Sequence, residues 1–258
     1  MQSRRPGFPA RLPSTAAPAP VRAPVPMPAV APRVASLPPQ GVGLDSAAVR
    51  ARMVQRVAAT GITAAAVLQA LQAVERHRFV DSALVNQAYE DTSLPIGLGQ
   101  TISKPSVVAR MLQLLLGAPG AKGGLGRVLE IGTGCGYQAA LLGQMAREVY
   151  SMERLRGLHE RARSNLRPLR LTNVHLILGD GMQGYAPGAP YAAIIAAAGG
   201  EAVPAPWCDQ LARGGRLVAP LADASGRQAL LVIDKTEQGF KEVVLEAVHF
   251  VPLKSGIA

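Results

Sequence analysis

The chain has 258 residues, enough for one α/β domain with a sizeable core and too few for two such domains with a tail. Its formal net charge is +10, but residues 1–44 contain five of the arginines and no acid, so nucleic acid is an unlikely partner. No apolar run approaches the roughly 20 residues of a membrane span, and no unbroken apolar segment follows the first arginines as in a signal peptide. Neither cysteine has a second Cys or His at metal-ligand spacing. We therefore expect a cytoplasmic protein with no membrane contact and no bound metal.

Residues 1–42 are dominated by Pro, Ala and Val, and proline removes the backbone donors that helices and sheets require. We expect a disordered Pro/Ala-rich extension here, acting as an inert spacer. The rest of the chain, residues 43–258, is expected to form a single domain.

Two helices are expected after this extension. Apolar residues recur at helical spacing over residues 45–61, on a face formed by Val49, Met53 and Val57. A second helix is expected after Thr63, whose side chain is a plausible N-cap. Together the two helices are predicted to form an N-terminal cap on the main domain.

The segment after the cap has no regular periodicity as far as Ser103. Pro105 then suits the first turn of a helix through "SVVARMLQLLLG". From residue 127 onwards, short β-rich runs alternate with helical stretches. Because parallel neighbours need a crossover element between them, this alternation predicts an α/β fold with a doubly wound, mostly parallel sheet.

A glycine-rich turn follows the first of these strands in "VLEIGTGCGYQAALL". Gly132, Gly134 and Gly136 allow the backbone to approach a ligand closely at the N-terminus of the next helix, although a tight packing turn would need the same residues. Tyr137 stands where a dinucleotide fingerprint has its third glycine. The loop by itself leaves a nicotinamide dinucleotide and S-adenosylmethionine as alternatives.

Acidic residues end the neighbouring strands. Glu153 lies about 20 residues beyond the glycines, where a carboxylate can accept hydrogen bonds from both ribose hydroxyls. Asp180 follows the third strand, where it can reach an adenine amine while Gly181 permits close approach of the backbone. Glu130 is a further polar anchor or orients backbone amides. Each acid has an alternative interpretation as a solvated strand end, but the combination indicates an adenosine-containing ligand.

These blocks together resemble the protein-L-isoaspartate O-methyltransferase family over about residues 45–258. The resemblance is carried by "AYEDTSLPIGLGQTISKPSVVARMLQLL", "VLEIGTGCGYQAALL", "ERLRGLHERARSNL", "GDGMQGYAPGAPYAAII", "LARGGRLVAPL" and "VHFVPL". It implies a class I S-adenosylmethionine-dependent methyltransferase (Rossmann-like) fold with an N-terminal helical cap. Residues 43–104 would form the cap and substrate loop, and residues 105–258 the cofactor-binding core.

The resemblance also implies an activity and a set of site residues. The methyl group of S-adenosyl-L-methionine would pass to the free α-carboxyl of L-isoaspartyl residues in damaged proteins and peptides, and the enzyme would act as a monomer. Ser103 matches the family's active-site serine. The implied cofactor-binding residues are Glu130, Gly132, Thr133, Gly134, Gly136, Glu153, Asp180 and Gly181, and the implied substrate-binding residues are Gln100, Thr101 and Ser103.

Chemistry makes this activity plausible without the family name. A carboxylate is already an ionised nucleophile at neutral pH, so the site must position it and exclude water and needs no general base. Hydroxyls and backbone amides suffice to hold its oxygens. Ser103 also has an alternative structural role, as the N-cap of the helix that begins at Pro105.

Three departures from the family pattern affect this prediction. Ala192 replaces a polar residue, Ser106 is smaller than the usual Tyr or His, and Gly199-Gly200 replaces a proline-containing loop and is expected to be mobile. Two alternative functions follow from such changes and from the basic charge. One is a non-catalytic S-adenosylmethionine-binding module, and the other is a methyltransferase for another substrate such as nucleic acid, although the N/D-P-P-Y/F type motif for amino-nitrogen transfer is absent.

Overall fold

The structure is a computed structural model that describes residues 47–121 and 124–258. The predicted extension over residues 1–42 lies outside the described part. Within the described residues, no helix is long and apolar enough to cross a membrane.

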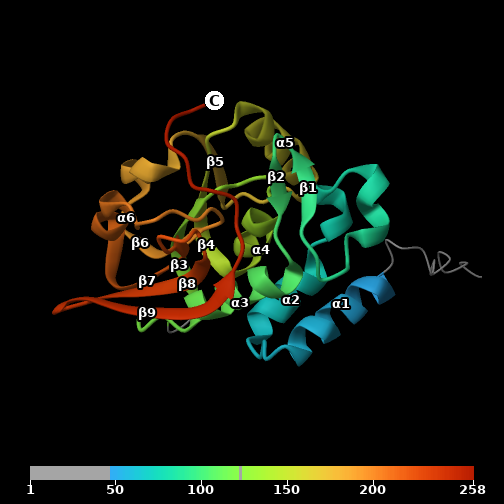
Figure 1. Ribbon diagram of the computed structural model, residues 1–258. Helices are drawn as coiled ribbons and strands as arrows, with labels where there is room; N and C mark the ends of the chain where they lie inside the picture. The colour runs from blue at the N-terminus through green and yellow to red at the C-terminus, as the bar shows by residue number, and fades with distance from the viewer. Residues whose placement is uncertain (1–46, 122–123) are drawn as a thin grey trace, which may run out of the picture. The chain divides into compact units, whose positions relative to one another are not determined.

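A seven-stranded sheet organises the domain, with the strand order β5-β4-β3-β6-β7-β8-β9 (Figure 1). Its strands are β3 (Leu125–Ile131), β4 (Ala146–Glu153), β5 (Val174–Leu178), β6 (Tyr191–Ala196), β7 (Leu211–Ala222), β8 (Gln228–Thr236) and β9 (Gly239–Val248). The first four pairings in this order are parallel and the last two are antiparallel. The predicted mostly parallel sheet is therefore confirmed. The chain order reverses between β3 and β6, which is where such sheets bind ligands.

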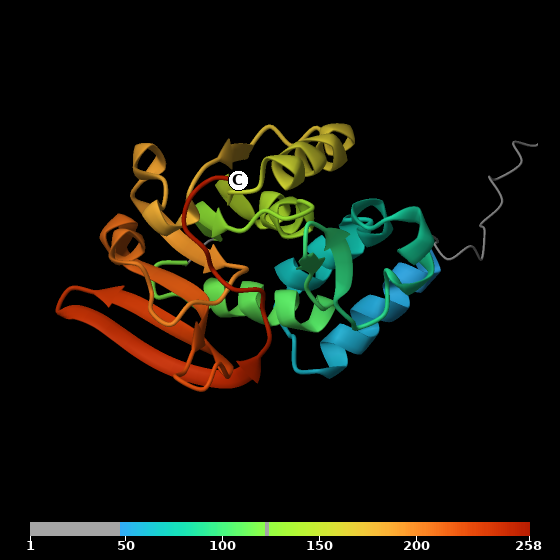
Figure 2. The same cartoon turned by 45° about the horizontal axis from the view of Figure 1, so that its top comes forward.

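Helices cover both faces of this sheet (Figure 2). The helices α3 (Pro105–Leu116), α4 (Tyr137–Met145) and α5 (Arg156–Leu166) pack on one face, and α6 (Ala205–Gln210) packs on the other. Side chains alternate between the faces along each strand, so that Val128 joins the first apolar cluster and Leu129 the second. Both residues are fully buried.

The two predicted cap helices are present as α1 (Ala47–Ala59) and α2 (Ala65–Ala73). The prediction of Thr63 as an N-cap is wrong, because Ala64 occupies that position and no side chain of its own caps the helix. Instead, Gln113 of α3 accepts hydrogen bonds from the backbone N–H groups of Thr63 at 2.7 Å and Ala64 at 2.9 Å. A side chain from α3 therefore caps the start of α2 in place of the expected local residue.

The segment expected to be irregular contains short regular elements. These are the 3-10 helices η1 (Arg76–Phe79) and η2 (Ser82–Gln87) and an antiparallel hairpin of β1 (Leu94–Gly97) and β2 (Gln100–Ile102). The hairpin turns through Gly97, Leu98 and Gly99, which have φ values of 88°, 52° and 69°. Leu98 is the one residue of the three for which this conformation is unfavourable.

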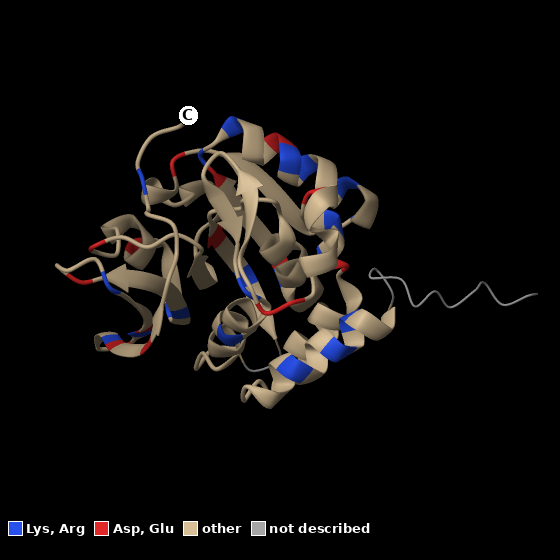
Figure 3. Cartoon of the chain, turned by 45° about the vertical axis from the view of Figure 1, so that its right-hand side comes forward, with Lys and Arg blue, Asp and Glu red and all other residues tan. Residues whose placement is uncertain are grey.

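The hairpin is joined to α5 by hydrogen bonds. Arg161 donates hydrogen bonds to the carbonyl of Ile96 at 2.7 Å and to the carboxylate of Asp81 at 2.8 Å. The side chain of Leu98 lies over Gly157, where an added Cβ would come within 3.2 Å of it. Figure 3 shows basic residues on the outside of α5. Arg161 belongs to this helix, and its hydrogen bond to Ile96 ties the hairpin to it.

The start of α3 is held by Asp91, and the alternative role of Ser103 as its N-cap is wrong. The N-cap is Lys104, with no hydrogen bond from its side chain. Asp91 accepts hydrogen bonds from the backbone N–H of Ser106 at 2.8 Å and from its hydroxyl at 2.7 Å. Ser106, one of the departures from the family pattern, therefore has a structural partner. Ser103 is left free for another role.

We expect Asp91→Ala to lower the free energy of unfolding by about 1 kcal/mol, the usual effect of losing a capping carboxylate. Ser103→Ala should change it by less than about 0.5 kcal/mol, because no cap is lost. Urea denaturation of the two variants and the wild type measures both effects. Equal losses in the two variants would contradict this assignment.

Candidate active site

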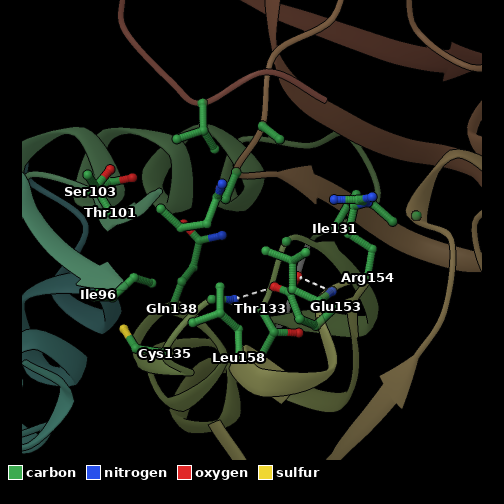
Figure 4. A pocket seen from close by; sticks show the side chains of 18 of the residues that line it. Ile96, Thr101, Ser103, Ile131, Thr133, Cys135, Gln138, Glu153, Arg154 and Leu158 are labelled. Atoms are coloured by element: carbon green, nitrogen blue, oxygen red, sulfur yellow. Dashed lines mark hydrogen bonds between the residues drawn. The ribbon is translucent and has the colours of Figure 1, made fainter. Parts of the chain in front are cut away.

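A pocket lies at the carboxyl ends of β3, β4 and β6, with about 900 Å³ of empty space that includes its open mouth (Figure 4). Three parts of the chain form it: the glycine turn after β3, the β1–β2 hairpin, and the C-terminal segment 251–254. Of the predicted site residues, those that line it are Gln100, Thr101, Ser103, Gly132, Thr133, Gly134, Glu153 and Gly181. The remaining three, Glu130, Gly136 and Asp180, lie outside its lining.

The glycine turn forms one wall, where Gly132 and Gly134 lie beside the side chains of Thr133 and Cys135. Gly132 and Gly134 have φ values of 90° and 57°. A Cβ at Gly134 would stand 3.2 Å from the side chain of Ile96, inside the pocket. Gly136 also has a positive φ, but its added Cβ would meet Leu166 at 3.1 Å. Gly136 therefore allows α4 to pack against α5 and does not face the pocket.

Glu153 fixes the glycine turn. One carboxylate oxygen accepts the N–H of Gly134 at 2.8 Å, and the other accepts the N–H of Leu155 at 2.9 Å (Figure 4). The residue is 5% exposed. Each carboxylate oxygen has two acceptor positions, so both retain capacity for a ligand hydroxyl at the pocket surface.

Behind the glycine turn, Glu130 belongs to a buried polar chain. Its carboxyl accepts a hydrogen bond from the hydroxyl of Ser151, which is 2.6 Å from the hydroxyl of Thr133 in the pocket wall. The other oxygen of Glu130 has no hydrogen-bond partner among the described residues. Burial raises the pKa of Glu130 to about 8, against the opposing effects of Ser151 and Gln138. Glu130 therefore supports the pocket from behind.

Asp180 is engaged with backbone groups. One oxygen accepts the N–H of Met182 at 2.9 Å, and the other accepts the N–H of Gly256 at 2.8 Å. The second bond holds the C-terminal segment against the loop after β5. Its neighbour Gly181 lines the pocket, where an added Cβ would meet Ile131 at 2.6 Å. A side chain at position 181 would therefore clash with Ile131.

The C-terminal segment is a part of the pocket that the sequence did not indicate. Gly199 donates a hydrogen bond to the carbonyl of Val251 at 2.9 Å and accepts one from the N–H of Leu253 at 2.7 Å. The Gly199-Gly200 loop, expected to be mobile, is thus paired with the chain terminus. The resemblance of "VHFVPL" to the family was the available signal, but no chemistry-bearing residue in it indicated a pocket.

The hydroxyls of the substrate loop face this pocket. Within the described part of the chain, the hydroxyls of Thr101 and Ser103 have no hydrogen-bond partner. Both residues line the cavity opposite the glycine turn (Figure 4). A second residue missed from the sequence is Arg76, whose side chain is completely buried beneath this loop. In the sequence it stands among charged and polar neighbours, in Glu75-Arg76-His77-Arg78, so no local signal distinguished it.

Comparison with known proteins gives consistent matches. The family model described as Protein-L-isoaspartate(D-aspartate) O-methyltransferase matches residues 48–258. A Protein-L-isoaspartate O-methyltransferase of Methylibium petroleiphilum is 62% identical over 220 residues, covering 84% of this chain and 81% of that protein. One from Leptothrix cholodnii is 61% identical over 218 residues, covering 84% and 77%.

Two solved structures have the same fold. A protein-L-isoaspartate O-methyltransferase has a TM-score of 0.72 and 28% identity, covering 81% of this chain and 67% of that one. A β-aspartate methyltransferase from Plasmodium falciparum, in complex with S-adenosyl-L-homocysteine, has a TM-score of 0.66 and 24% identity, covering 80% and 98%. At this identity, the second match supports the fold alone.

Glu130 predicts a pH dependence of stability. Its pKa is raised from 4.5 to about 8 on folding, so the folded protein binds more protons than the unfolded chain between these values. Stability should therefore fall as pH rises through this range and level off above about 8. We expect the unfolding free energy of the wild type, relative to Glu130→Gln, to decrease in this way in urea titrations. Parallel pH profiles of the two proteins would contradict the shift.

Proposed function

The chain belongs to the protein-L-isoaspartate(D-aspartate) O-methyltransferase family, and on this basis we propose how its pocket carries out the reaction of a repair methyltransferase. The protein transfers the methyl group of S-adenosyl-L-methionine to the free α-carboxyl of L-isoaspartyl residues in damaged proteins and peptides. The residue assignments rest on one observation: the glycine turn and the β1–β2 hairpin line the same cavity.

The residues of the pocket fit S-adenosyl-L-methionine. When bound, this cofactor supplies an electrophilic methyl group on a sulfonium. We propose that the cofactor lies close against the backbone at Gly132 and Gly134, because a Cβ at Gly134 would project into the cavity. Glu153 is assigned to ribose hydroxyls through its remaining acceptor positions. Gly181 provides a second surface without a side chain, and Asp180 holds the loop that carries it.

The substrate carboxylate is assigned to the opposite wall. Thr101 and Ser103 offer hydroxyl donors there, and neither hydroxyl is committed to another residue of the described chain. Gln100 lies next to them, and its amide donates to the carbonyl of Leu98 at 3.4 Å. Because the carboxylate is ionised at neutral pH, these donors have to orient it and no residue has to remove a proton. Ser103 is therefore proposed as the catalytic residue by contact with the substrate.

The apolar surroundings complete the arrangement. Ile96 from the hairpin and Leu158 from α5 are buried and line the pocket together with Ile131. Such a lining excludes water from the site of two opposite charges that neutralise one another during transfer. The methyl ester then leaves the enzyme, and the amide nitrogen of the following residue attacks the ester carbonyl, which closes a succinimide and releases methanol. Hydrolysis of the succinimide returns some normal aspartate.

We extend the proposal to the setting in which the protein acts. Cys135 and Cys208 are both free thiols, which suits a reducing compartment such as the cytoplasm. The proposed site is formed by a single chain, as expected for a monomeric enzyme. The two alternative functions considered from the sequence, a binding module and a nucleic-acid methyltransferase, have no such support from family membership.

The activity is tested by methyl transfer from labelled S-adenosyl-L-methionine to a peptide that contains L-isoaspartate. We expect labelling of this peptide and background labelling of its normal aspartyl isomer. Equal labelling of the two isomers, or labelling of neither, would reject the proposed function.

Ser103→Ala should lower kcat/KM for the isoaspartyl peptide by about tenfold or more, the usual effect of losing a hydrogen bond to a charged group. The affinity for S-adenosyl-L-homocysteine should stay within about twofold, because the cofactor is assigned to the opposite wall. Steady-state kinetics and calorimetric titration measure these quantities. Full turnover in the variant would remove Ser103 from the mechanism.

A further inference from the structure

The guanidinium of Arg76 is completely buried beneath the substrate loop. Its Nε donates to the carbonyl of Ala88 at 2.8 Å. Its Nη2 donates to the carbonyl of Ser103 at 2.7 Å and to that of Thr92 at 3.4 Å. The guanidinium carbon also lies 4.8 Å from the centre of the Tyr137 ring. One side chain from η1 thus contacts the substrate loop and the first residue of α4.

This charge has no carboxylate partner. Within the described chain, no Asp or Glu lies within 4 Å of the Arg76 guanidinium, and its Nη1 has no hydrogen-bond partner. Burial lowers the pKa of Arg76, against the opposing effects of Tyr137, Cys135 and Asp91, but an arginine stays protonated in proteins. Burying a charge without a counter-charge raises the free energy of the folded protein. The presence of this charge is explained if a ligand or a functional role compensates it.

The position of the charge indicates which ligand compensates it. Ser103 and Tyr137, the two residues that Arg76 contacts on the pocket side, both line the cavity. The guanidinium therefore lies directly behind the wall to which the substrate carboxylate is assigned. A negative charge placed against this wall is attracted through low-dielectric protein, where screening by water and salt is weak.

We propose that Arg76 is the positioning residue that makes this site select an ionised α-carboxylate. It holds Ser103 by the main-chain carbonyl, so that the hydroxyl is presented to the pocket, and it keeps an unneutralised positive charge behind that hydroxyl. This inference rests on the proposed function, because it names the group by which that function recognises its substrate. Arg76 does not touch the substrate and acts through Ser103.

The test compares two peptides that differ in one group. One carries the isoaspartyl α-carboxylate, and the other carries the α-carboxamide at the same position. Both are titrated calorimetrically into protein saturated with S-adenosyl-L-homocysteine, so that no transfer occurs. The preference for the carboxylate is the ratio of the two dissociation constants, and a merely structural loosening of the cap would weaken both peptides alike and leave this ratio unchanged.

The variants are Arg76→Met, Arg76→Lys and a matched control, Arg50→Met. Arg50 is a largely buried arginine of the same cap, but its charge faces Glu75 at 3.5 Å and it makes no contact with Ser103. We expect the preference to fall by about tenfold in Arg76→Met and to stay at the wild-type value in Arg50→Met. Arg76→Lys should keep the preference, because the charge remains. It should lose about tenfold in kcat, because an ammonium does not reproduce the separate guanidinium bonds to the carbonyls of Ala88 and Ser103.

Each result is decisive. An unchanged preference in Arg76→Met, or an equal loss in Arg50→Met, would overturn the proposal. If Arg76→Met does not fold, Arg76→Lys decides alone: a lost preference or an unchanged kcat would overturn it. Wild-type protein that methylates no isoaspartyl peptide would overturn the proposed function instead.

Discussion

A single buried guanidinium joins the parts of this protein that must meet to form a site. Arg76 comes from the N-terminal cap, but its hydrogen bonds end on the carbonyls of Ala88 and Ser103, and its flat face lies against Tyr137. These three residues belong to the segment before the hairpin, to the substrate loop and to the cofactor helix. The active site proposed above therefore includes the cap, because Arg76 donates a hydrogen bond to the carbonyl of Ser103 in the substrate loop.

The topology of the sheet determines the position of the pocket that the substrate loop lines. The chain order reverses between β3 and β6, so the glycine turn after β3 opens a crevice at the carboxyl edge. Glu153 from the neighbouring strand holds that turn by the N–H of Gly134. The hairpin lies over the same crevice and is fastened to α5 by Arg161. The walls that we assign to cofactor and to substrate are thus held by different elements and face each other across one cavity.

The chain terminus closes the third side. Residues 251–254 line the pocket, and Gly199 holds this segment through hydrogen bonds with Val251 and Leu253. Just beyond it, Gly256 donates a hydrogen bond to Asp180. Asp180 therefore has a structural task in this conformation, since both of its oxygens accept backbone N–H groups. The sequence suggested that the carboxylate of Asp180 reaches an adenine amine. The same carboxylate also holds the chain near its C-terminus through Gly256. A bound adenine would have to share Asp180 with Gly256.

The sequence by itself determined the elements that depend on local chemistry. Helical and strand periodicity predicted the sheet and its helices, and the glycine turn with its strand-end acid Glu153 predicted the ligand crevice. Only the tertiary structure decided which groups pair across long separations. Gln113 holds the start of α2 where Thr63 was expected, Asp91 holds α3 where Ser103 was the alternative, and Arg76 lies behind the substrate loop. Local propensity depends on neighbouring residues, so it can be inferred from the sequence. A hydrogen bond between residues 15 to 76 positions apart depends on how packed elements bring their side chains together.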